Sequence, residues 1–435
     1  MFRYLILIGM LLCLAACADS SNENGGKTLV SVWAHSGQAA EREVLQTQIA
    51  RFNSQQQAIQ ARLTLLPEGT YNGQVQASAL ADDMPCVLEF DGPYVYNYVW
   101  QGKLIPLDDF LTPALRRELL PSLMVQGNYR HRQYTVATFD SGLGLYARKS
   151  LLTKIGVRIP QGPDSAWSVA EFNAILQGLR KFDVDGQVLD MKLNYSGEWF
   201  AYGFSPVLQS AGGDLIDRSE HRSANGVLNG AAAVEAMSQL QSWIRGGYVD
   251  PNLDDAAFTQ GRVALTWAGH WEYPRYNKAF GKDLLVLPLP DFGRGMRTGQ
   301  GSWNWGITSS CKRPGEAWRF LAFLLRPEEV AAMTHANGAV PATRIAIARS
   351  PLYKAGGPLH LYARQLADGY SVPRPQTPAY PIISSAFEQA FRDIQNGGEV
   401  QAALDRAVAV IDRDIGDNKG YPPVMMHRDE ARTDD

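Results

Sequence analysis

Two aspartates and a set of tryptophans carry most of the side-chain chemistry that this sequence offers. Asp91 closes the apolar run CVLEF at residues 86–90, and Asp140 interrupts a second apolar run that begins at Tyr134. Two carboxylates at a suitable separation can hydrolyse a glycosidic bond. Carboxylates beside aromatic rings can instead bind a sugar, because its C–H face packs on a ring while its hydroxyls pair with polar groups. The sequence does not measure the distance between the two carboxylates, so both chemistries stay open at this point.

A tryptophan-rich stretch raises a related question. Residues 298–310 read TGQGSWNWGITSS and place Trp303 and Trp305 around Asn304, in a glycine-rich approach to a short apolar strand. A core strand does not need indoles at a mouth bordered by glycines. Either the two rings fill a seam between elements, or one of them faces a ligand. The chain has ten tryptophans and eighteen tyrosines, and so many aromatic rings suit a protein that binds a ligand with a flat face.

Other reaction chemistries leave no motif in the chain. We find no GxSxG, HExxH, P-loop or CxxC pattern and no metal-ligand cluster among the seven histidines. The formal net charge of −3 is dispersed, which does not suggest a nucleic-acid surface. The sequence therefore predicts a protein that is not an enzyme, with no cofactor, no metal site and no nucleic-acid partner.

The N-terminus indicates export. An apolar run at residues 5–16 is too short to cross a bilayer of about 30 Å as a helix, which is typical of a secretory signal. Its ending, LAAC at residues 14–17, resembles the lipobox of bacterial lipoproteins, so we predict that residues 1–16 are removed and that Cys17 is acylated and anchored to a membrane. Ordinary signal cleavage that leaves the Cys17 thiol free is the alternative. Residues 17–27 are polar and rich in Gly and Ser, which suits a flexible tether.

Two further cysteines, Cys86 and Cys311, remain in the exported chain. In an oxidising compartment they could form one disulfide. Their spacing does not prove it, and two separately buried thiols are the alternative.

The first part of the chain alternates strands and helices. Strands are predicted at residues 29–33, 61–66 and 86–90, with helices at residues 40–52 and 75–81 between them. Ser36 is a candidate cap for the first helix. This βαβαβ order favours a parallel sheet with helices on both faces and with ligands beyond the carboxyl ends of its strands.

A second section follows a crossover. Asp140-Ser141-Gly142 interrupts the run from Tyr134, and small flexible residues at mid-strand suit a hinge between two lobes. The chain remains too long for one ordinary core after loss of the signal peptide, so two lobes of α/β class are predicted. The later elements are expected as helices at residues 169–179, near Trp199 and at 231–244, strands at 263–267 and 284–289, and a final helical pair broken at Gly397-Gly398.

Several motifs occur in an order that resembles a known family. They are VWAHSG, DGPYVYNYVWQGKLIPLDDFL, YTVATFDSGLGLYARKSLLTKIG, AGGDLID, FTQGRVALTWAGHW, GITSSCKRPGEAWRFLAFLL and NGAVPATR. Together they resemble the extracellular solute-binding proteins of ABC importers, and more narrowly the sugar-binding branch that includes maltose and trehalose receptors. The resemblance implies a type II periplasmic-binding-protein fold, in which two α/β lobes joined by a multi-segment hinge enclose the ligand and deliver it to a membrane permease.

The resemblance also implies site residues. Asp91 and Asp140 match positions where the family has acids that bind hydroxyls, although Asp91 could cap a helix and Asp140 could bond local hinge amides. Trp271 and Trp303 match positions where the family stacks an indole on a sugar ring, with Asn304 as a neighbouring hydroxyl partner. We therefore expect Trp303 to face the ligand, with the glycines beside it letting the backbone approach the sugar.

Other positions carry over less directly. Trp305 is expected to pack against the sheet. Trp199 and Tyr202 are either a wall of the site or a satellite core cluster. Arg374 resembles a late-chain arginine that donates to hydroxyls in pairs, and its alternative is a surface cation in a proline-rich loop. His35 and Ser36 occupy the turn after the first strand, where some relatives have an acid, and this difference leaves the sugar open.

The predicted lobes are residues 28–140 with 303–355, and residues 141–302 with 356–435. The predicted function is capture of a sugar, a disaccharide or short oligosaccharide of the α-glucoside (maltose or trehalose) type, by a lipid-anchored monomer that faces the periplasm or, in a Gram-positive cell, the outer surface. A glycerophosphodiester or polyamine receptor on the same fold is the alternative, followed by a glycoside hydrolase using the two aspartates. Polyamine binding would need more acids beside the aromatics, and phosphate esters would need clustered arginines.

Overall fold

The computed structural model describes residues 26–422. The predicted signal peptide, the acylated Cys17 and nearly all of the predicted tether lie outside these residues. Among the helices of the described part of the chain, none is both long and apolar enough to cross a membrane.

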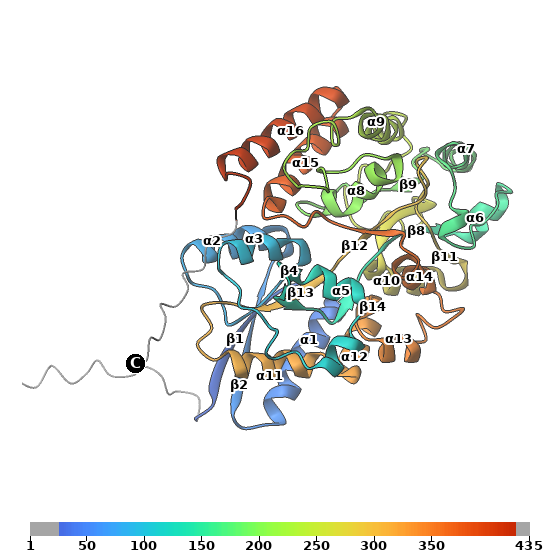
Figure 1. Ribbon diagram of the computed structural model, residues 1–435. Coiled ribbons are helices and arrows are strands. Elements are labelled where there is room, and N and C mark those ends of the chain that lie inside the picture. The colour runs from blue at the N-terminus through green and yellow to red at the C-terminus, as the bar shows by residue number, and fades with distance from the viewer. Residues whose placement is uncertain (1–25, 423–435) are drawn as a thin grey trace, which may run out of the picture.

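A five-stranded sheet with the order β2-β1-β3-β13-β6 defines what we term the first lobe (Figure 1). The three strands β2, β1 and β3 are parallel, as the βαβαβ order predicts, whereas β13 runs antiparallel between β3 and β6. The strands of this sheet are β1 (Thr28–His35), β2 (Ile59–Leu66), β3 (Val87–Asp91), β6 (Thr135–Val136) and β13 (Trp303–Ile307).

Both faces of the first sheet are buried, because successive side chains of a strand point to opposite faces. Val30 and Val32 of β1 pack into a core with α1 and α11, while Leu88 and Phe90 of β3 pack into the opposite core with α2 and α3. The main helices of this lobe are α1 (Ala39–Ser54), α2 (Tyr71–Leu80), α3 (Val95–Trp100), α11 (Pro314–Leu324) and α12 (Pro327–Asn337).

The predicted cap of the first helix is wrong. Helix α1 begins at Ala39, and its N-cap residue is Gln38. The amide of Ser36 instead donates to the carbonyl of Leu66 at 2.9 Å, which prolongs the pairing of β1 with β2 and delays the start of the helix.

A four-stranded sheet with the order β11-β8-β10-β9 defines the second lobe. Its strands are β8 (Leu143–Arg148), β9 (Leu189–Asp190), β10 (Leu265–Gly269) and β11 (Leu284–Leu287). Helices α8, α15 and α16 pack together over it, as Figure 1 shows. The helices of this lobe are α6 (Lys149–Lys154), α7 (Val169–Arg180), α8 (Trp199–Ala211), α9 (Ala231–Arg245), α10 (Tyr273–Phe280), α15 (Tyr380–Gln395) and α16 (Val400–Asp417).

The chain passes between the two sheets more than once. The first passage lies between β6 and β8, where the sequence predicts a crossover, and β7 (Phe139–Asp140) pairs there with β14 (Val340–Pro341). A second passage leads from β11 to β13 through β12 (Thr298–Gln300), which pairs with β15 (Ser371–Pro373). The remaining helices and strands are α4 (Pro113–Glu118), α5 (Pro121–Gln126), β4 (Asn128–Tyr129), β5 (Arg132–Gln133), α13 (Arg344–Arg349) and α14 (His360–Ala367).

Cys86 and Cys311 form a disulfide, which decides between the two alternatives stated for these thiols. It joins the segment before β3 to the turn after β13, at the end of these strands that lies away from Asp91.

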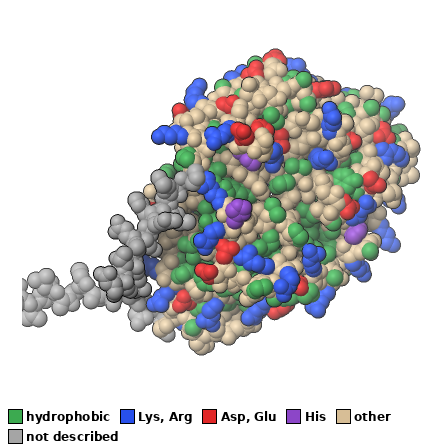
Figure 2. Space-filling view, in the orientation of Figure 1, with side chains coloured by type: hydrophobic (Ala, Val, Ile, Leu, Met, Phe, Trp, Pro, Cys, Tyr) green, Lys and Arg blue, Asp and Glu red, His purple; other side chains and the backbone are tan. Residues whose placement is uncertain are grey.

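On the face seen in Figure 2, basic and acidic side chains are interspersed, in keeping with the dispersed charge of the sequence.

Candidate functional site

Three strand ends of the first lobe meet at one edge of its sheet. His35 ends β1, and Asp91 ends the parallel strand β3. Trp303 begins β13 and pairs directly with Asp91, because β13 is antiparallel to β3. This edge is where ligands bind in sheets of this kind.

The second lobe presents a matching edge. Gly269 ends β10 opposite Leu143, the first residue of β8. Trp271 follows two residues later, and its ring lies so close to Gly269 that a Cβ there would come within 1.9 Å of it. Gly269 therefore has no room for a side chain, and the indole folds back over the end of its own strand.

A cavity of about 500 Å³ lies between these two edges and is lined by residues of both lobes. Its volume falls within the range of about 300–1,000 Å³ that is usual for small-molecule sites. Seven Phe, Tyr and Trp side chains of the described residues line it: Tyr94, Phe139, Tyr195, Trp199, Tyr202, Trp271 and Trp303.

Arg374 joins the two lobes across this cavity. Its Nη1 and Nη2 donate to the two oxygens of Asp91 at 2.8 and 2.5 Å, and Nη1 also donates to Glu198 at 2.5 Å. The guanidinium carbon lies 4.9 Å from the centre of the Tyr202 ring. The arginine is buried, which excludes the surface cation considered from the sequence. Asp91 makes no helix-capping hydrogen bond, so its side chain serves Arg374 instead.

Glu198 is the second carboxylate of this junction. Besides Arg374, it accepts hydrogen bonds from Tyr380 Oη and from Ser384 Oγ, the latter at 2.6 Å. Burial raises the pKa of Glu198 to about 7, against the opposing charge of Arg374 and with a further contribution from Asp91. The junction therefore holds two carboxylates around a single cation.

His35 is bound on both ring nitrogens. Its Nδ1 donates to Glu89 at 2.7 Å, and its Nε2 lies 3.7 Å from Glu41. Burial alone would lower the pKa of His35, but these two carboxylates raise it well above its ordinary value. The imidazolium stacks on Trp303 with ring centres 3.7 Å apart and planes 3° apart. His35 thus supports the indole, and both of its ring nitrogens are occupied.

Trp199 and Tyr202 are both core residues and wall residues. They are 6% and 7% exposed, belong to the core of the second lobe and also line the cavity. Trp199 packs edge-to-face against Trp271 at 6.1 Å, and Tyr202 Oη donates to Ser141 Oγ at 2.9 Å. The pair therefore packs in the core and lines the cavity, and its contact with a ligand remains a prediction.

Three of the predicted site residues do not line the cavity. Asp140 is fully buried and accepts hydrogen bonds from Ser122 and from the amides of Ser141 and Gly301. This is the hinge arrangement that was its alternative. Asn304 is fully buried as well, and Ser36 is absent from the cavity lining.

Neighbouring polar groups explain the position of Asn304. Its amide donates to Gln126 Oε1 at 2.9 Å, and its oxygen accepts from Thr135 Oγ1 at 2.9 Å. The expectation about the glycines beside Trp303 stays a prediction. A Cβ at Gly299 would meet the Tyr202 ring at 2.8 Å, and one at Gly301 would meet Gln126 Nε2 at 2.2 Å, whereas Gly301 itself lines the cavity.

Trp305 is 2% exposed and packs in the core of the first lobe, as predicted. The two tryptophans of residues 298–310 therefore have different surroundings. Trp305 fills the core, and Trp303 lines the cavity, where its contact with a ligand remains a prediction.

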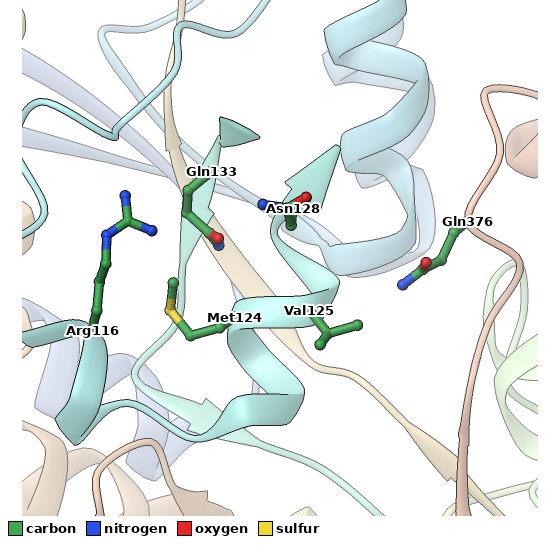
Figure 3. Close-up of a pocket in the computed structure, with 6 residues that line it drawn as sticks. All are labelled: Arg116, Met124, Val125, Asn128, Gln133 and Gln376. Carbon is green, nitrogen blue, oxygen red and sulfur yellow. The ribbon is translucent and has the colours of Figure 1, made fainter. Parts of the chain in front are cut away.

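A second hollow, of about 380 Å³, lies beside α5 (Figure 3). It is lined by Arg116, Met124, Val125, Asn128, Gln133 and Gln376. This lining contains no aromatic ring and no carboxylate, and Arg116 is already paired with Asp108 at 2.9 Å. The hollow lacks the stacking surfaces that the cavity between the lobes provides. Within residues 26–422, no group of three His, Cys, Asp or Glu side chains is placed to hold a metal ion.

Comparison with known proteins decides the family. Residues 47–357, more than half of the chain, match the family of bacterial extracellular solute-binding proteins. The chain belongs to this family. Membership confirms the predicted resemblance to extracellular solute-binding proteins and the two-lobed α/β fold. The family consists of binding proteins and not of enzymes, and its extracellular function implies that the chain is exported. A search of curated protein sequences found no match.

Solved structures share the fold of this solute-binding protein at low identity. A cyclic alpha-maltosyl-1,6-maltose binding protein from Arthrobacter globiformis is 21% identical, with a TM-score of 0.72 over 90% of this chain and 100% of its own. The sugar-binding protein MalE from Xanthomonas citri is 20% identical, with a TM-score of 0.71 over 90% and 98%. A solute-binding protein from Thermotoga lettingae, solved with alpha-D-tagatose, is 20% identical, with a TM-score of 0.76 over 89% and 99%.

The sequence missed several residues of this site, above all Glu198, Tyr380 and Glu41. Glu198 directly precedes Trp199, but its partner Arg374 lies 176 residues away. Glu41 faces the cavity from α1 and bonds Asn337 of α12. Position next to a predicted site residue is the one local signal that could have suggested Glu198.

Proposed function

We propose that this solute-binding protein captures a sugar for an ABC importer. The ligand is a disaccharide or short oligosaccharide, such as an α-glucoside of the maltose or trehalose type, and the lobes close around it by hinge motion before delivery to a membrane permease. The single observation that carries this proposal is the cavity between the lobes, with Trp303 from one lobe and Trp271 from the other.

The chemistry of the lining supports a sugar. Aromatic rings offer surfaces for the C–H face of a pyranose, while carboxylates and the junction arginine offer paired partners for adjacent hydroxyls. At about 0.3 kcal/mol per heavy atom, a disaccharide of roughly two dozen heavy atoms reaches about micromolar affinity. The structures named above for maltosyl-maltose and tagatose share this fold and are consistent with that ligand class.

Two rival functions fit the cavity less well. A phosphate ester would need cationic partners, but the lining offers the single guanidinium of Arg374, which already serves two carboxylates. A glycoside hydrolase would need Asp91 and Asp140 as a working pair, and Asp140 does not line the cavity. A polyamine receptor is the second candidate, because the lining contains six carboxylates beside its aromatic rings.

The wider assignment is also part of the proposal. Residues 28–140 with 303–355 form one lobe, and residues 141–302 with 356–422 form the other; residues 423–435, which the sequence assigns to the second lobe, lie outside the described residues. The strands of each sheet fall within these limits, which supports the division. The mature protein is a monomer, held to a membrane by a lipid on Cys17 and facing the periplasm or the outer cell surface.

Intrinsic tryptophan fluorescence tests the proposal. The exported body, from Lys27 onward, is titrated with mono- and disaccharides, alongside Trp271→Ala and Trp303→Ala. We expect a saturable signal for a disaccharide in the unmodified protein and about a tenfold or larger loss of affinity in both variants.

Trp318→Ala is the matched control, because Trp318 lies on α11 and does not line the cavity. It should retain the affinity of the unmodified protein. Silence across the whole sugar panel, with a saturable response to spermidine or to a glycerophosphodiester, would leave the fold standing and remove the sugar.

A further inference from the structure

The cavity holds more negative charge than its surroundings neutralise. Among the described residues, its lining includes six carboxylates but only one arginine and no lysine. They are Glu41, Glu68, Asp91, Glu198, Asp255 and Glu388. By contrast, charges of both signs are interspersed on the face seen in Figure 2, and the whole chain has a formal net charge of only −3.

Most of these carboxylates share their cations with other acids. Arg374 serves both Asp91 and Glu198, and His35 lies between Glu41 and Glu89. When Glu68 and every acid that competes for the same cations are included, nine carboxyl groups face five cations, so the acidic groups outnumber the cations by four. The acids are Glu41, Glu68, Glu89, Asp91, Asp190, Glu198, Asp255, Glu272 and Glu388, and the cations are His35, Lys192, Arg275, Arg374 and Arg392.

Glu68 is the acid with the least compensation. Within residues 26–422 it has no ion-pair partner, and its side chain remains accessible in the cavity. Desolvation by the surrounding protein raises the pKa of Glu68, and the charges of Glu41 and Asp91 raise it further, while the charge of His35 lowers it. Asn72, one helical turn later, has its Oδ1 buried without a hydrogen-bond partner in the part of the chain that the structure describes. The first lobe thus presents acceptors that lack a donor.

The opposite wall shows the reverse. The indole N–H of Trp199 and the Nε–H of Arg374 are buried without a partner among the described residues, and these side chains are only 6% and 4% exposed. Both residues line the cavity. A buried donor without an acceptor costs roughly 1–3 kcal/mol, so a ligand that supplies acceptor oxygens here gains affinity.

The two walls therefore match a ligand that has two chemically different parts. Acceptor oxygens suit the donors of Trp199 and Arg374, and a positive charge suits Glu68 and its neighbours. A polyamine carries no acceptor oxygen. A neutral sugar leaves the negative excess unbalanced, and an acidic sugar increases it.

We propose that the ligand of this cavity is an amino sugar, a saccharide whose oxygens accept from Trp199 and Arg374 and whose protonated amine lies against Glu68, Glu41 and Asn72. This inference rests on the proposed function and narrows its ligand class. The turn that carries Glu68 also approaches the second lobe, since a Cβ at Gly69 would lie 3.6 Å from Ser196 Oγ. Closure of the lobes therefore encloses the amine and strengthens its contact with the carboxylates.

Calorimetric titration of the exported chain at pH 7 tests this proposal with matched ligands. One set is cellobiose, the β-1,4 glucosamine disaccharide and its N-acetylated form, and the other is trehalose, 2-amino-2-deoxytrehalose and its N-acetylated form. In the set whose linkage the cavity accepts, the amine should bind roughly tenfold or more tightly than either neutral form. That preference should shrink at high salt.

In Glu68→Gln, the ratio of the affinity for the amine to the affinity for the neutral forms should fall about tenfold. The substitution is not expected to affect folding, because Glu68 has no ion-pair partner to lose. Glu43→Gln on α1 removes the same charge from the same lobe outside the cavity and should leave the preference intact. An unchanged preference in Glu68→Gln would overturn the position assigned to the amine.

The outcomes separate this inference from the proposed function. Equal binding of amine and neutral disaccharide would overturn the amino-sugar assignment and leave a sugar receptor standing. Binding of spermidine with no response to any saccharide would overturn both.

Discussion

The two walls of the cavity use different chemistry. The first-lobe wall is mainly ionisable, with Glu41, Glu68, Asp91 and His35 around an indole that stacks on the imidazolium. The second-lobe wall has more aromatic rings, with Tyr195, Trp199, Tyr202 and Trp271, and it also carries Glu198, Asp255 and Glu388. Arg374 connects the two walls through its ion pair with Asp91, and it also pairs with Glu198 of its own lobe. The difference teaches that both lobes supply acids and rings, but that the acid with the least compensation, Glu68, lies opposite the larger group of rings, so the site is complete only when both lobes are brought together.

The largest expected effect is at the connection between the walls. Arg374→Ala leaves Asp91 and Glu198 buried beside each other without their cation. Removal of one partner of a buried ion pair costs about 3–5 kcal/mol, so we expect a loss of this size in the free energy of unfolding, measured with denaturant.

Arg158→Ala is the control for this variant. Arg158 makes an exposed ion pair with Glu171 at 2.7 Å, and exposed pairs contribute about 1 kcal/mol or less. Equal losses in the two variants would contradict the importance given to the connection between the lobes.

The next effect is a pH dependence of stability. Folding raises the pKa of Glu198 from 4.5 to about 7, so the folded form keeps a proton that the unfolded form releases. This contribution is fully present below about pH 4.5 and is lost as the pH rises towards 7. The melting temperature of Glu198→Gln, relative to the unmodified protein, should therefore be higher at pH 8 than at pH 4.5. A difference that stays constant across this range would refute the prediction.

A smaller effect is expected on the aromatic wall. Trp199→Phe keeps a ring against Trp271 but removes the buried N–H donor. A hydrogen bond of about 0.5–1.5 kcal/mol corresponds to roughly two- to tenfold in affinity for the sugar found in the fluorescence titration. If the affinity rises or stays the same, the indole N–H has no ligand partner.

The smallest effect is expected next to the charged wall. Ser36 neither caps α1 nor lines the cavity, although it follows His35 directly. Ser36→Ala should leave sugar affinity within about twofold and stability within about 0.5 kcal/mol. A tenfold loss of affinity would show that the turn after β1 contacts the ligand.

Local pattern was enough for much of the fold. The spacing of apolar residues predicted β1, α1, β2, α2 and β3 to within a few residues, because strands and helix faces that pack in a core must be apolar at fixed periods. The small residues at 140–142 marked the passage between the sheets, where the chain cannot continue one strand.

The site was only partly predictable, because its polar pairs join distant segments. Asn304 lies next to Trp303 in sequence, yet its amide bonds Gln126, which lies 178 residues away. Glu198 likewise finds Arg374 176 residues later. No local signal describes such contacts. Trp271 and Trp303 were instead predicted from the family resemblance, and both line the cavity.

The most direct test of the central claim is a crystal structure of the complex with the saccharide that binds most tightly. The account predicts the sugar in the cavity between the lobes, in contact with both Trp271 and Trp303. A sugar bound elsewhere, such as in the hollow of Figure 3, with the cavity between the lobes free of it, would contradict the account.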